Sequence, residues 1–355
     1  MLSRGLLPAA VLLLITAVAG CATAPAAPHT AEPLAALKPV PDPKSRTGPS
    51  SAVLAQADIS APPPAQHLPV TVTDHQGTRV TVTDTSRVLA FDMAGTLAAT
   101  VFGLGLGDRV VGRDVSTGFP AAQRLPLVTR NGHQLNAEAI MALRPTVILT
   151  DTTLGPWDVV LQLRDSGIPV VVLDPKRTMD NVGALVHDTA AALGVPEAGQ
   201  RLSARLDEDI ATKKAEITRL APAEPARKLR VVFLYLRGQA GVYYLFGRGS
   251  GADSLITALG AVDVASEAGV EGMRPMTPEA LVKARPDVIL LMTKGLESVG
   301  GPDGLLQVPG VAQTPAGLHR RFVDMADSEI LSFGPRTPGV LDALARALYA
   351  PGAGG

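Results

Sequence analysis

The unit "EAIMALRPTVIL" occupies residues 138–149 and recurs as "EALVKARPDVIL" at residues 279–290, aligned without a gap. The two copies share seven of twelve positions, namely Glu, Ala, Arg, Pro, Val, Ile and Leu. Each copy predicts a helix that ends before Arg-Pro and turns directly into a buried strand, because proline lacks an N–H and disfavours helical geometry in the residue before it. The repeat therefore predicts two lobes of like architecture.

The segments around the first copy alternate between helical and strand patterns. A hairpin is expected in "VTVTDHQGTRVTV", followed by a helix in "AGTLAATVFGLGL" and strands in "TVILTD" and "IPVVVLD". Strands that are apolar throughout, with helices between them, are typical of a parallel sheet covered on both faces. Residues 67–176 are therefore expected to form an N-terminal α/β lobe.

The alternation stops at residues 177–222, where two helices follow each other. Leu185 and Val186 belong to the apolar face of the first helix, and Leu206 and Ile210 to that of the second. The α/β pattern resumes in "LRVVFLYL" and continues to the end of the chain. We therefore expect a long helical connector at residues 177–222 and a C-terminal α/β lobe at residues 223–355.

The first residues have the pattern of an export signal with a lipoprotein cleavage site. Arg4 precedes an apolar run that is short for a membrane span, and the run ends in "VAGC", where Cys21 is the only cysteine of the chain. We expect a signal peptide at residues 1–20, lipidation of Cys21 and no disulfides. Residues 21–66 are rich in Ala and Pro and lack aromatic residues, which predicts a disordered tether.

Composition and motifs weigh against several functional classes. The formal net charge is −1 and there is no basic stripe, so nucleic acid is not expected as a partner. The sequence has no Gly-rich phosphate loop after a strand, no G-x-S-x-G, no H-E-x-x-H and no cysteine cluster. We therefore expect no enzyme, and an exported α/β enzyme or metal-binding protein stays a remote alternative.

Two unusual side chains end the apolar strand "VVFLYLRGQAG" at residues 231–241. Tyr235 and Arg237 are two residues apart and so lie on one face of a strand, where the guanidinium can reach the phenol oxygen and favour its ionised form. Open α/β sheets bind ligands beyond the carboxyl ends of their strands. The pair is therefore a candidate ligand site.

Taken together, these features resemble the substrate-binding lipoproteins of ATP-driven importers for iron-siderophores, cobalamin and haem. The likeness covers about residues 68–350 and rests on the lipoprotein cleavage site, the tether, the hairpin, the two lobes and the "LxxxxPDVIL"-type units. The strings that resemble the haem-binding branch are "NGHQLNAEAI", "FLYLRGQAGVY", "TKGLESVGGPDGLLQVPGVAQTPAG" and "SFGPRTP". The implied fold is the class III periplasmic-binding-protein type.

The resemblance implies that His133 and Tyr235 are the axial ligands of a haem iron, one from each lobe. A neutral imidazole and a hard phenolate both suit ferric iron. Arg237 would support the phenolate or pair with a haem propionate. Further candidates for the haem pocket are Met292, Arg336, Tyr243 and Met273. No role is expected for His29, His67, His75, His187 or His319.

Glu138 and Glu279 are the acids shared by the two repeats. Each follows a candidate helix cap, Asn136 or Thr277, where a carboxylate suits the positive end of the helix dipole. The resemblance implies a second role, in which one acid per lobe docks onto arginines of a membrane permease.

The resemblance as a whole predicts a monomeric haem receptor that is exported and lipid-anchored on the outer face of the cytoplasmic membrane. It would bind ferric haem between its lobes and deliver it to an ABC permease and its ATPase. An iron-siderophore or cobalamin receptor of the same class stays an alternative.

Overall fold

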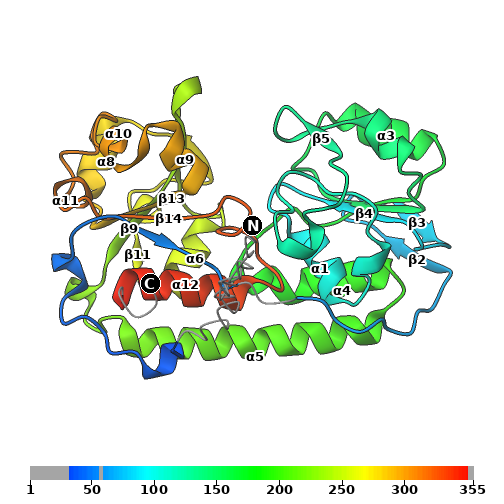
Figure 1. The fold of residues 1–355 in the computed structure, drawn as a ribbon, viewed down its shortest axis with the longest axis horizontal. Coiled ribbons are helices and arrows are strands. Elements are labelled where there is room, and N and C mark those ends of the chain that lie inside the picture. Colours follow the sequence, from blue (N-terminus) through cyan, green and yellow to red (C-terminus); the bar gives the residue numbers. More distant parts are fainter. Residues whose placement is uncertain (1–31, 56–58, 351–355) are drawn as a thin grey trace, which may run out of the picture.

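Two α/β lobes lie side by side along one long helix, α5 (Pro196–Leu220), in the computed structural model (Figure 1). The structure describes residues 32–55 and 59–350. The predicted signal peptide at residues 1–20 and Cys21 therefore lie outside the described residues. Within the described part, no helix is both long enough and apolar enough to cross a membrane. The predicted fold, two α/β lobes with a helical connector, is confirmed.

A parallel sheet in the order β4-β7-β8 forms the centre of the N-terminal lobe. Its strands are β4 (Val88–Phe91), β7 (Val147–Thr150) and β8 (Val170–Val172). The predicted hairpin is formed by β2 (Val70–Thr73) and β3 (Arg79–Val82). The other elements of this lobe are α1 (Thr96–Gly103), η3 (Gly107–Arg109), η4 (Pro120–Ala122), β5 (Thr129–Arg130), β6 (Gln134–Leu135), α2 (Ala137–Ala142), α3 (Trp157–Asp165), η5 (Met179–Asn181) and α4 (Val182–Ala192).

The C-terminal lobe contains a larger, mixed sheet in the order β1-β14-β13-β9-β10-β12, with β11 paired to β9. Strands β14, β13 and β9 are parallel, whereas β10 returns antiparallel to β9 and pairs with β12. The strands are β1 (Ser50–Ala52), β9 (Arg230–Arg237), β10 (Val242–Phe246), β11 (Val262–Asp263), β12 (Met273–Pro275), β13 (Val288–Met292) and β14 (Phe322–Met325). The helices are η6 (Pro225–Arg227), η7 (Gly238–Ala240), α6 (Ala252–Ala258), α7 (Val264–Glu267), α8 (Pro278–Ala284), α9 (Thr293–Ser298), α10 (Gly301–Leu305), α11 (Pro315–Leu318) and α12 (Thr337–Tyr349).

The sequence repeat forms equivalent structure in both lobes. Helix α2 leads into β7, and α8 leads into β13. The arginine before each proline has a positive φ, 45° at Arg144 and 49° at Arg285. A left-handed residue after the last helical turn, followed by proline, is a common way to end a helix. The repeat thus places a buried parallel strand directly after its helix in each lobe.

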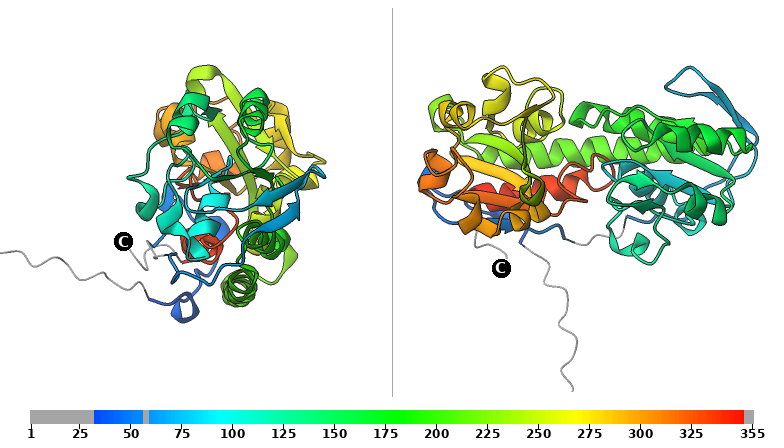
Figure 2. Two further views of the ribbon diagram at one scale, coloured as in Figure 1. Left: turned by 90° about the vertical axis from the view of Figure 1, so that its right-hand side faces the viewer. Right: turned by 90° about the horizontal axis from the view of Figure 1, so that it is seen from above.

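Helix α5 spans both lobes. Its 25 residues correspond to a length of about 37 Å. It packs against α4 at the N-terminal lobe and against α12 at the C-terminal lobe (Figure 2). Helix α4 contacts α1 and β2. The predicted connector at residues 177–222 therefore contains one helix that belongs to the N-terminal lobe and one that spans the molecule.

Alternation along the strands separates an inner face of each sheet from an outer face. Val88 and Ala90 of β4 join the same hydrophobic core as Val231 and Phe233 of β9, and this core also contains α5 and α12. The residues between them face two separate outer cores, one per lobe. The inner faces of both lobes are thus joined by one continuous core.

Residues 32–55 pack on the C-terminal lobe, so the prediction of a disordered tether at residues 21–66 is wrong for this segment. Strand β1 pairs in parallel with β14, with Ser50 opposite Val323. Leu34 and Leu54 are buried. Prolines restrict the unfolded backbone and so reduce the entropy lost on docking, and a few spaced leucines are enough to hold such a segment. Residues 21–31 lie outside the described part.

The chain between residue 59 and the hairpin contacts the other lobe. Gln66 donates a hydrogen bond from Nε2 to the carbonyl of Leu193, at 2.9 Å, and another to Thr85 Oγ1, at 2.8 Å. The chain before the hairpin therefore contacts both lobes.

Candidate functional site

Tyr235 lies near the end of β9 on the inner face of the C-terminal sheet. Its ring stacks on Phe246 of β10, with centroids 5.7 Å apart and planes at 16°. Phe246 also stacks on Phe233, at 5.0 Å and 27°. Although aromatic residues are few in this chain, three of them form one stack that fixes the orientation of the phenol ring.

Arg237, the last residue of β9, lies over the face of the Tyr235 ring. Its guanidinium carbon is 4.5 Å from the ring centroid, a cation–π arrangement. Its Nη1 donates to the carbonyl of Leu236 at 2.8 Å, and its Nη2 is 3.3 Å from Oδ1 of Asp327. Both residues lie on the predicted face, but the guanidinium contacts the phenol ring and the carboxylate instead of the predicted phenol oxygen.

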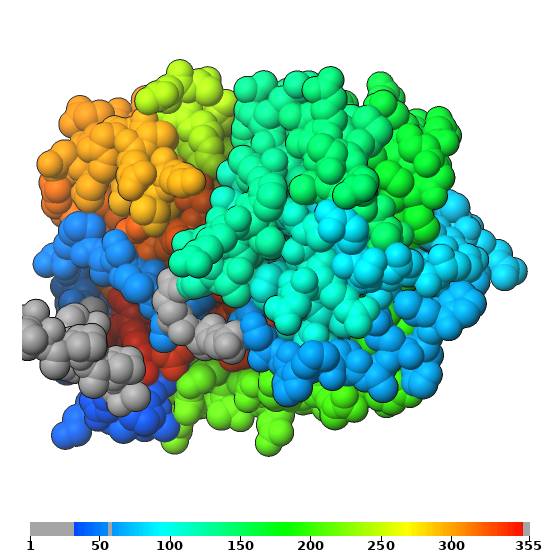
Figure 3. Space-filling model, turned by 45° about the vertical axis from the view of Figure 1, so that its right-hand side comes forward, coloured from blue at the N-terminus to red at the C-terminus, as the bar shows by residue number. Residues whose placement is uncertain are grey.

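His133 lies at the tip of the β5–β6 hairpin of the N-terminal lobe. The side chain is half-buried, and among the described residues its buried Nδ1 has no hydrogen-bond partner. Burial lowers the pKa of the imidazole, and so does the nearby charge of Arg237, while Asp327 raises it and Lys294 lowers it. Since these three groups belong to the C-terminal lobe, His133 faces that lobe. Figure 3 shows the two lobes in contact along a crease, with the β9–β10 region in yellow-green beside the N-terminal lobe.

The two lobes thus bring different functional groups to the contact between them. A neutral imidazole with a free, buried nitrogen comes from one lobe, and a phenol with a guanidinium comes from the other. Imidazole and phenolate can bind an iron centre from opposite sides, and the guanidinium can pair with an anionic group. Within the described residues there is no group of three His, Cys, Asp or Glu side chains that could hold a bare metal ion.

The secondary candidates divide between the two faces of the sheet. Met292 ends β13 and packs at the inner core, as does Tyr244. Met273 is opposite Phe246 in the β10–β12 pair and is exposed. Tyr243 packs against the outer core, on the face of the sheet opposite Tyr235, which does not favour its expected place in the haem pocket. The pairing of β9 with β10 explains why Tyr243 and Tyr244 face opposite sides of the sheet: Tyr244, not Tyr243, is opposite Tyr235.

Arg336 is buried at the contact between the lobes. Its Nη2 forms an ion pair with Glu329 at 2.7 Å, and its guanidinium lies 5.9 Å from the ring centroid of Phe119 in the N-terminal lobe. Arg336 thus has a carboxylate partner and lies at the contact between the lobes. Its expected role in the haem pocket stays a prediction.

Glu138 and Glu279 are exposed in the first turns of α2 and α8. The predicted caps are confirmed, because Asn136 accepts from the backbone N–H of Ala139 and Thr277 accepts from that of Ala280. The carboxylates themselves stay accessible at equivalent positions of the two lobes.

A buried cluster of charges lies at the ends of the N-terminal strands, and sequence reasoning missed it. Asp92 follows β4 and Asp151 follows the adjacent β7, and Arg177 Nη2 contacts both, at 2.9 and 2.6 Å. Asp114 accepts from the backbone N–H of Asp92 at 2.9 Å and from that of Thr117 at 2.7 Å. Burial, with the charge of Asp92, raises the pKa of Asp114 to about 7.

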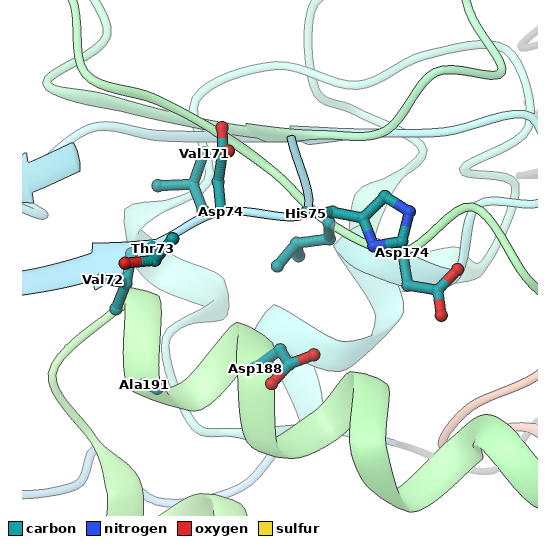
Figure 4. A pocket seen from close by; sticks show the side chains of 9 residues that line it. Val72, Thr73, Asp74, His75, Val171, Asp174, Asp188 and Ala191 are labelled. Carbon is teal, nitrogen blue, oxygen red and sulfur yellow. The ribbon is translucent and has the colours of Figure 1, made fainter. Parts of the chain in front are cut away.

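A separate pocket lies between β2, β8 and α4, on a different part of the N-terminal lobe (Figure 4). Its volume is about 320 Å³, and the side chains of His75, Asp174 and Asp188 surround it. Burial, followed by the charge of Asp174, raises the pKa of Asp188. None of the residues that line this pocket belongs to the set around His133 and Tyr235.

Comparison with known proteins gives consistent matches over this fold. Residues 93–329 match the family model described as periplasmic binding protein. The crystal structure of the haem-binding protein HmuT is 39% identical, with a TM-score of 0.82, over 87% of this chain and 99% of HmuT. The apo form of the periplasmic haem-binding protein RhuT from Roseiflexus sp. RS-1 is 36% identical, with a TM-score of 0.68, over 75% and 98%.

A curated relative gives a similar result. The uncharacterized ABC transporter substrate-binding lipoprotein YvrC of Bacillus subtilis (strain 168) is 24% identical over 299 residues, which are 83% of this chain and 90% of YvrC. Three further matching structures are HmuT mutants, with alanine in place of an arginine, a histidine or a tyrosine. The mutated tyrosine of HmuT precedes the mutated arginine by two positions.

Proposed function

The chain belongs to the periplasmic binding protein family, and from this premise we propose that it captures ferric haem between its lobes and delivers it to an ABC permease. It is a binding protein of a transport system and not an enzyme. Haem is its cargo. Identity of 34–39% to haem-binding members, over about three quarters or more of this chain, supports this ligand.

The observation that carries the proposal is the arrangement of His133 and Tyr235. His133 reaches from one lobe toward the group around Arg237 in the other, and its buried Nδ1 is free among the described residues. An imidazole whose pKa is lowered is neutral and available as a metal ligand at neutral pH. We assign His133 and Tyr235 as the axial ligands of the haem iron.

The surroundings of Tyr235 suit a flat aromatic ligand. The stack of Phe233, Phe246 and Tyr235 holds the phenol in one orientation, and Met292 adds a polarisable apolar side chain on the same face. We assign Arg237 and Met292 to the haem pocket and Met273 to its exposed edge. Tyr244 takes the place that sequence reasoning gave to Tyr243.

The ligand class is tested by titrating the purified protein with ferric haem, cobalamin and a ferric siderophore in parallel, with binding followed by quenching of Trp157 fluorescence. Saturation by haem at a one-to-one ratio, with no response to the other two, is the expected result. Saturation by cobalamin or the siderophore instead would make the protein a receptor of the same class for that ligand.

Glu138 and Glu279 are proposed to contact the permease. Both are exposed, and α8 lies at the side of the molecule opposite α5 (Figure 1). With one carboxylate on each lobe, the permease can contact both lobes at once, and arginines are suitable partners for carboxylates. We further propose that the protein is a monomer, exported and held by a lipid on Cys21 at the outer face of the cytoplasmic membrane.

Replacement of both acids, Glu138→Ala with Glu279→Ala, is expected to leave haem affinity unchanged and to reduce uptake through the permease by an order of magnitude or more. The matched control is Glu208→Ala with Glu224→Ala, which removes two exposed acids elsewhere on the surface. Equal uptake by the two double variants, or loss of haem binding in the first, would contradict the docking role.

A further inference from the structure

Asp327 lies where three strands of the C-terminal lobe end. It follows β14 by two residues, and its Oδ2 accepts a hydrogen bond from the backbone N–H of Lys294, at 3.0 Å, in the first turn after β13. Its Oδ1 is 3.3 Å from Nη2 of Arg237 at the end of β9. One carboxylate thus joins the ends of β14, β13 and β9.

These contacts determine where the Arg237 guanidinium lies. One nitrogen is held by the carbonyl of Leu236 at 2.8 Å and the other by Asp327. Between these two contacts, the guanidinium carbon is 4.5 Å from the Tyr235 ring centroid. An arginine at a strand end has many rotamers, and a carboxylate partner selects one of them.

Asp327 also places a negative charge beside the Arg237 guanidinium, which lies against the Tyr235 ring. Its carboxylate is 3.3 Å from Arg237 Nη2 and accepts from the backbone N–H of Lys294 at 3.0 Å. The Asp327 side chain is 19% exposed, so solvent screens its charge only in part. Without it, Arg237 would lose the carboxylate that partners its charge beside Tyr235.

We propose that Asp327 is a positioning residue of the haem site, which holds Arg237 against Tyr235 and offsets the positive charge beside the iron. The inference rests on the proposed haem-binding function. Ferric haem has one more positive charge than ferrous haem, so a nearby carboxylate favours the ferric form. Removal of this charge therefore raises the midpoint potential of the bound haem.

The test is a spectroelectrochemical titration of the haem complex of the full chain. Asp327→Asn keeps the shape and can still accept from Lys294 N–H, and we expect its midpoint potential to lie above that of the parent. Asp327→Glu keeps the charge and is expected to remain close to the parent. The matched control is Asp303→Asn, at an exposed acid of the same lobe whose partner is Arg320, and it is expected to leave the potential unchanged.

Positioning and charge are separated by a double-mutant cycle with Arg237→Gln. The Gln variant alone removes a cation and lowers the potential. If Asp327 sets the place of the guanidinium, the effects of the two substitutions are not additive. Additive shifts would overturn the positioning role.

An unchanged potential in Asp327→Asn would overturn the inference as a whole. If this variant does not fold, Asp327→Ser, whose hydroxyl can cap the same N–H, carries the same prediction. A parent that binds no haem would overturn the proposed function instead, so the two failures are distinguishable.

Discussion

Asp114 places a carboxyl group in a fully buried site below the ends of the N-terminal strands, where burial and the charge of Asp92 raise its pKa from 3.8 to about 7. The folded state therefore binds a proton that the unfolded state loses near pH 4. Between about pH 4 and 7 this difference reduces the free energy of unfolding as the pH rises, by at most about 1.4 kcal/mol per pH unit. Below pH 4 Asp114 is protonated in both states, so it no longer makes the free energy of unfolding depend on pH.

Asp114→Asn is expected to remove this part of the pH dependence. Denaturant unfolding of the ligand-free protein between pH 4 and 7.5 would give the free energy of unfolding, and the variant should gain stability relative to the parent as the pH rises. The control Asp84→Asn changes an exposed acid of the same lobe. Curves for parent and Asp114→Asn that stay parallel would contradict the assigned pKa.

For single residues, the sequence predicted part of the site. The period of two along β9 correctly placed Tyr235 and Arg237 on one face, but it could not place Tyr243, because the turn through η7 and Gly241 decides the register of β10. The buried acids had a signal that was not used, since Asp92 and Asp151 each directly follow a buried strand. The role of Asp327 depends on tertiary contacts alone.

Among the elements, the two Arg-Pro corners are the most regular feature of the chain. Arg144 and Arg285 both adopt the left-handed conformation, which side chains with a Cβ disfavour by about 1–2 kcal/mol, and both are exposed. Such a position accepts glycine at lower cost, because glycine lacks the Cβ. The sequence predicted where these helices end, whereas the left-handed residue became evident only in the structure.

Arg285→Gly is expected to stabilise the protein by a few tenths to about 1 kcal/mol, since relief of backbone strain exceeds the added entropy of the unfolded chain. The control Lys283→Gly, two residues earlier and inside α8, should destabilise by about 0.5–1 kcal/mol. Both are measured by chemical denaturation. An Arg285→Gly variant less stable than the parent would show that the side chain has a role that outweighs the strain.

For the molecule as a whole, the two lobes form one body. The inner faces of both sheets join a single hydrophobic core through α5 and α12. Arg336 reaches Phe119 across the lobe contact, and the N-terminal segment contacts both lobes. We therefore expect little relative movement of the lobes when ligand binds. Composition predicted a disordered N-terminal segment, because the average composition is dominated by Ala and Pro. It does not show that a few leucines, such as Leu34 and Leu54, are buried.

Two neighbouring residues test the packing of this segment. Leu54 is buried and lies so close to Gly339 of α12 that a methyl group added there would be 2.5 Å from it, whereas Val53 is 79% exposed. Leu54→Ala is expected to reduce the free energy of unfolding by about 2–4 kcal/mol, and Val53→Ala to change it by less than about 0.5 kcal/mol. Equal stability of the two variants would mean that the segment is not packed in solution.

The central claim, that one ligand from each lobe holds the iron of a bound haem, is tested most directly by the absorption spectrum of the ferric haem complex. His133→Ala and Tyr235→Phe are compared with the parent and with two controls, His75→Ala and Tyr243→Phe, which remove the same groups away from the proposed haem site. The account predicts a one-to-one Soret shift in the parent and both controls. It also predicts altered Soret and charge-transfer bands in His133→Ala and Tyr235→Phe. A parent spectrum preserved in both of these variants would contradict it.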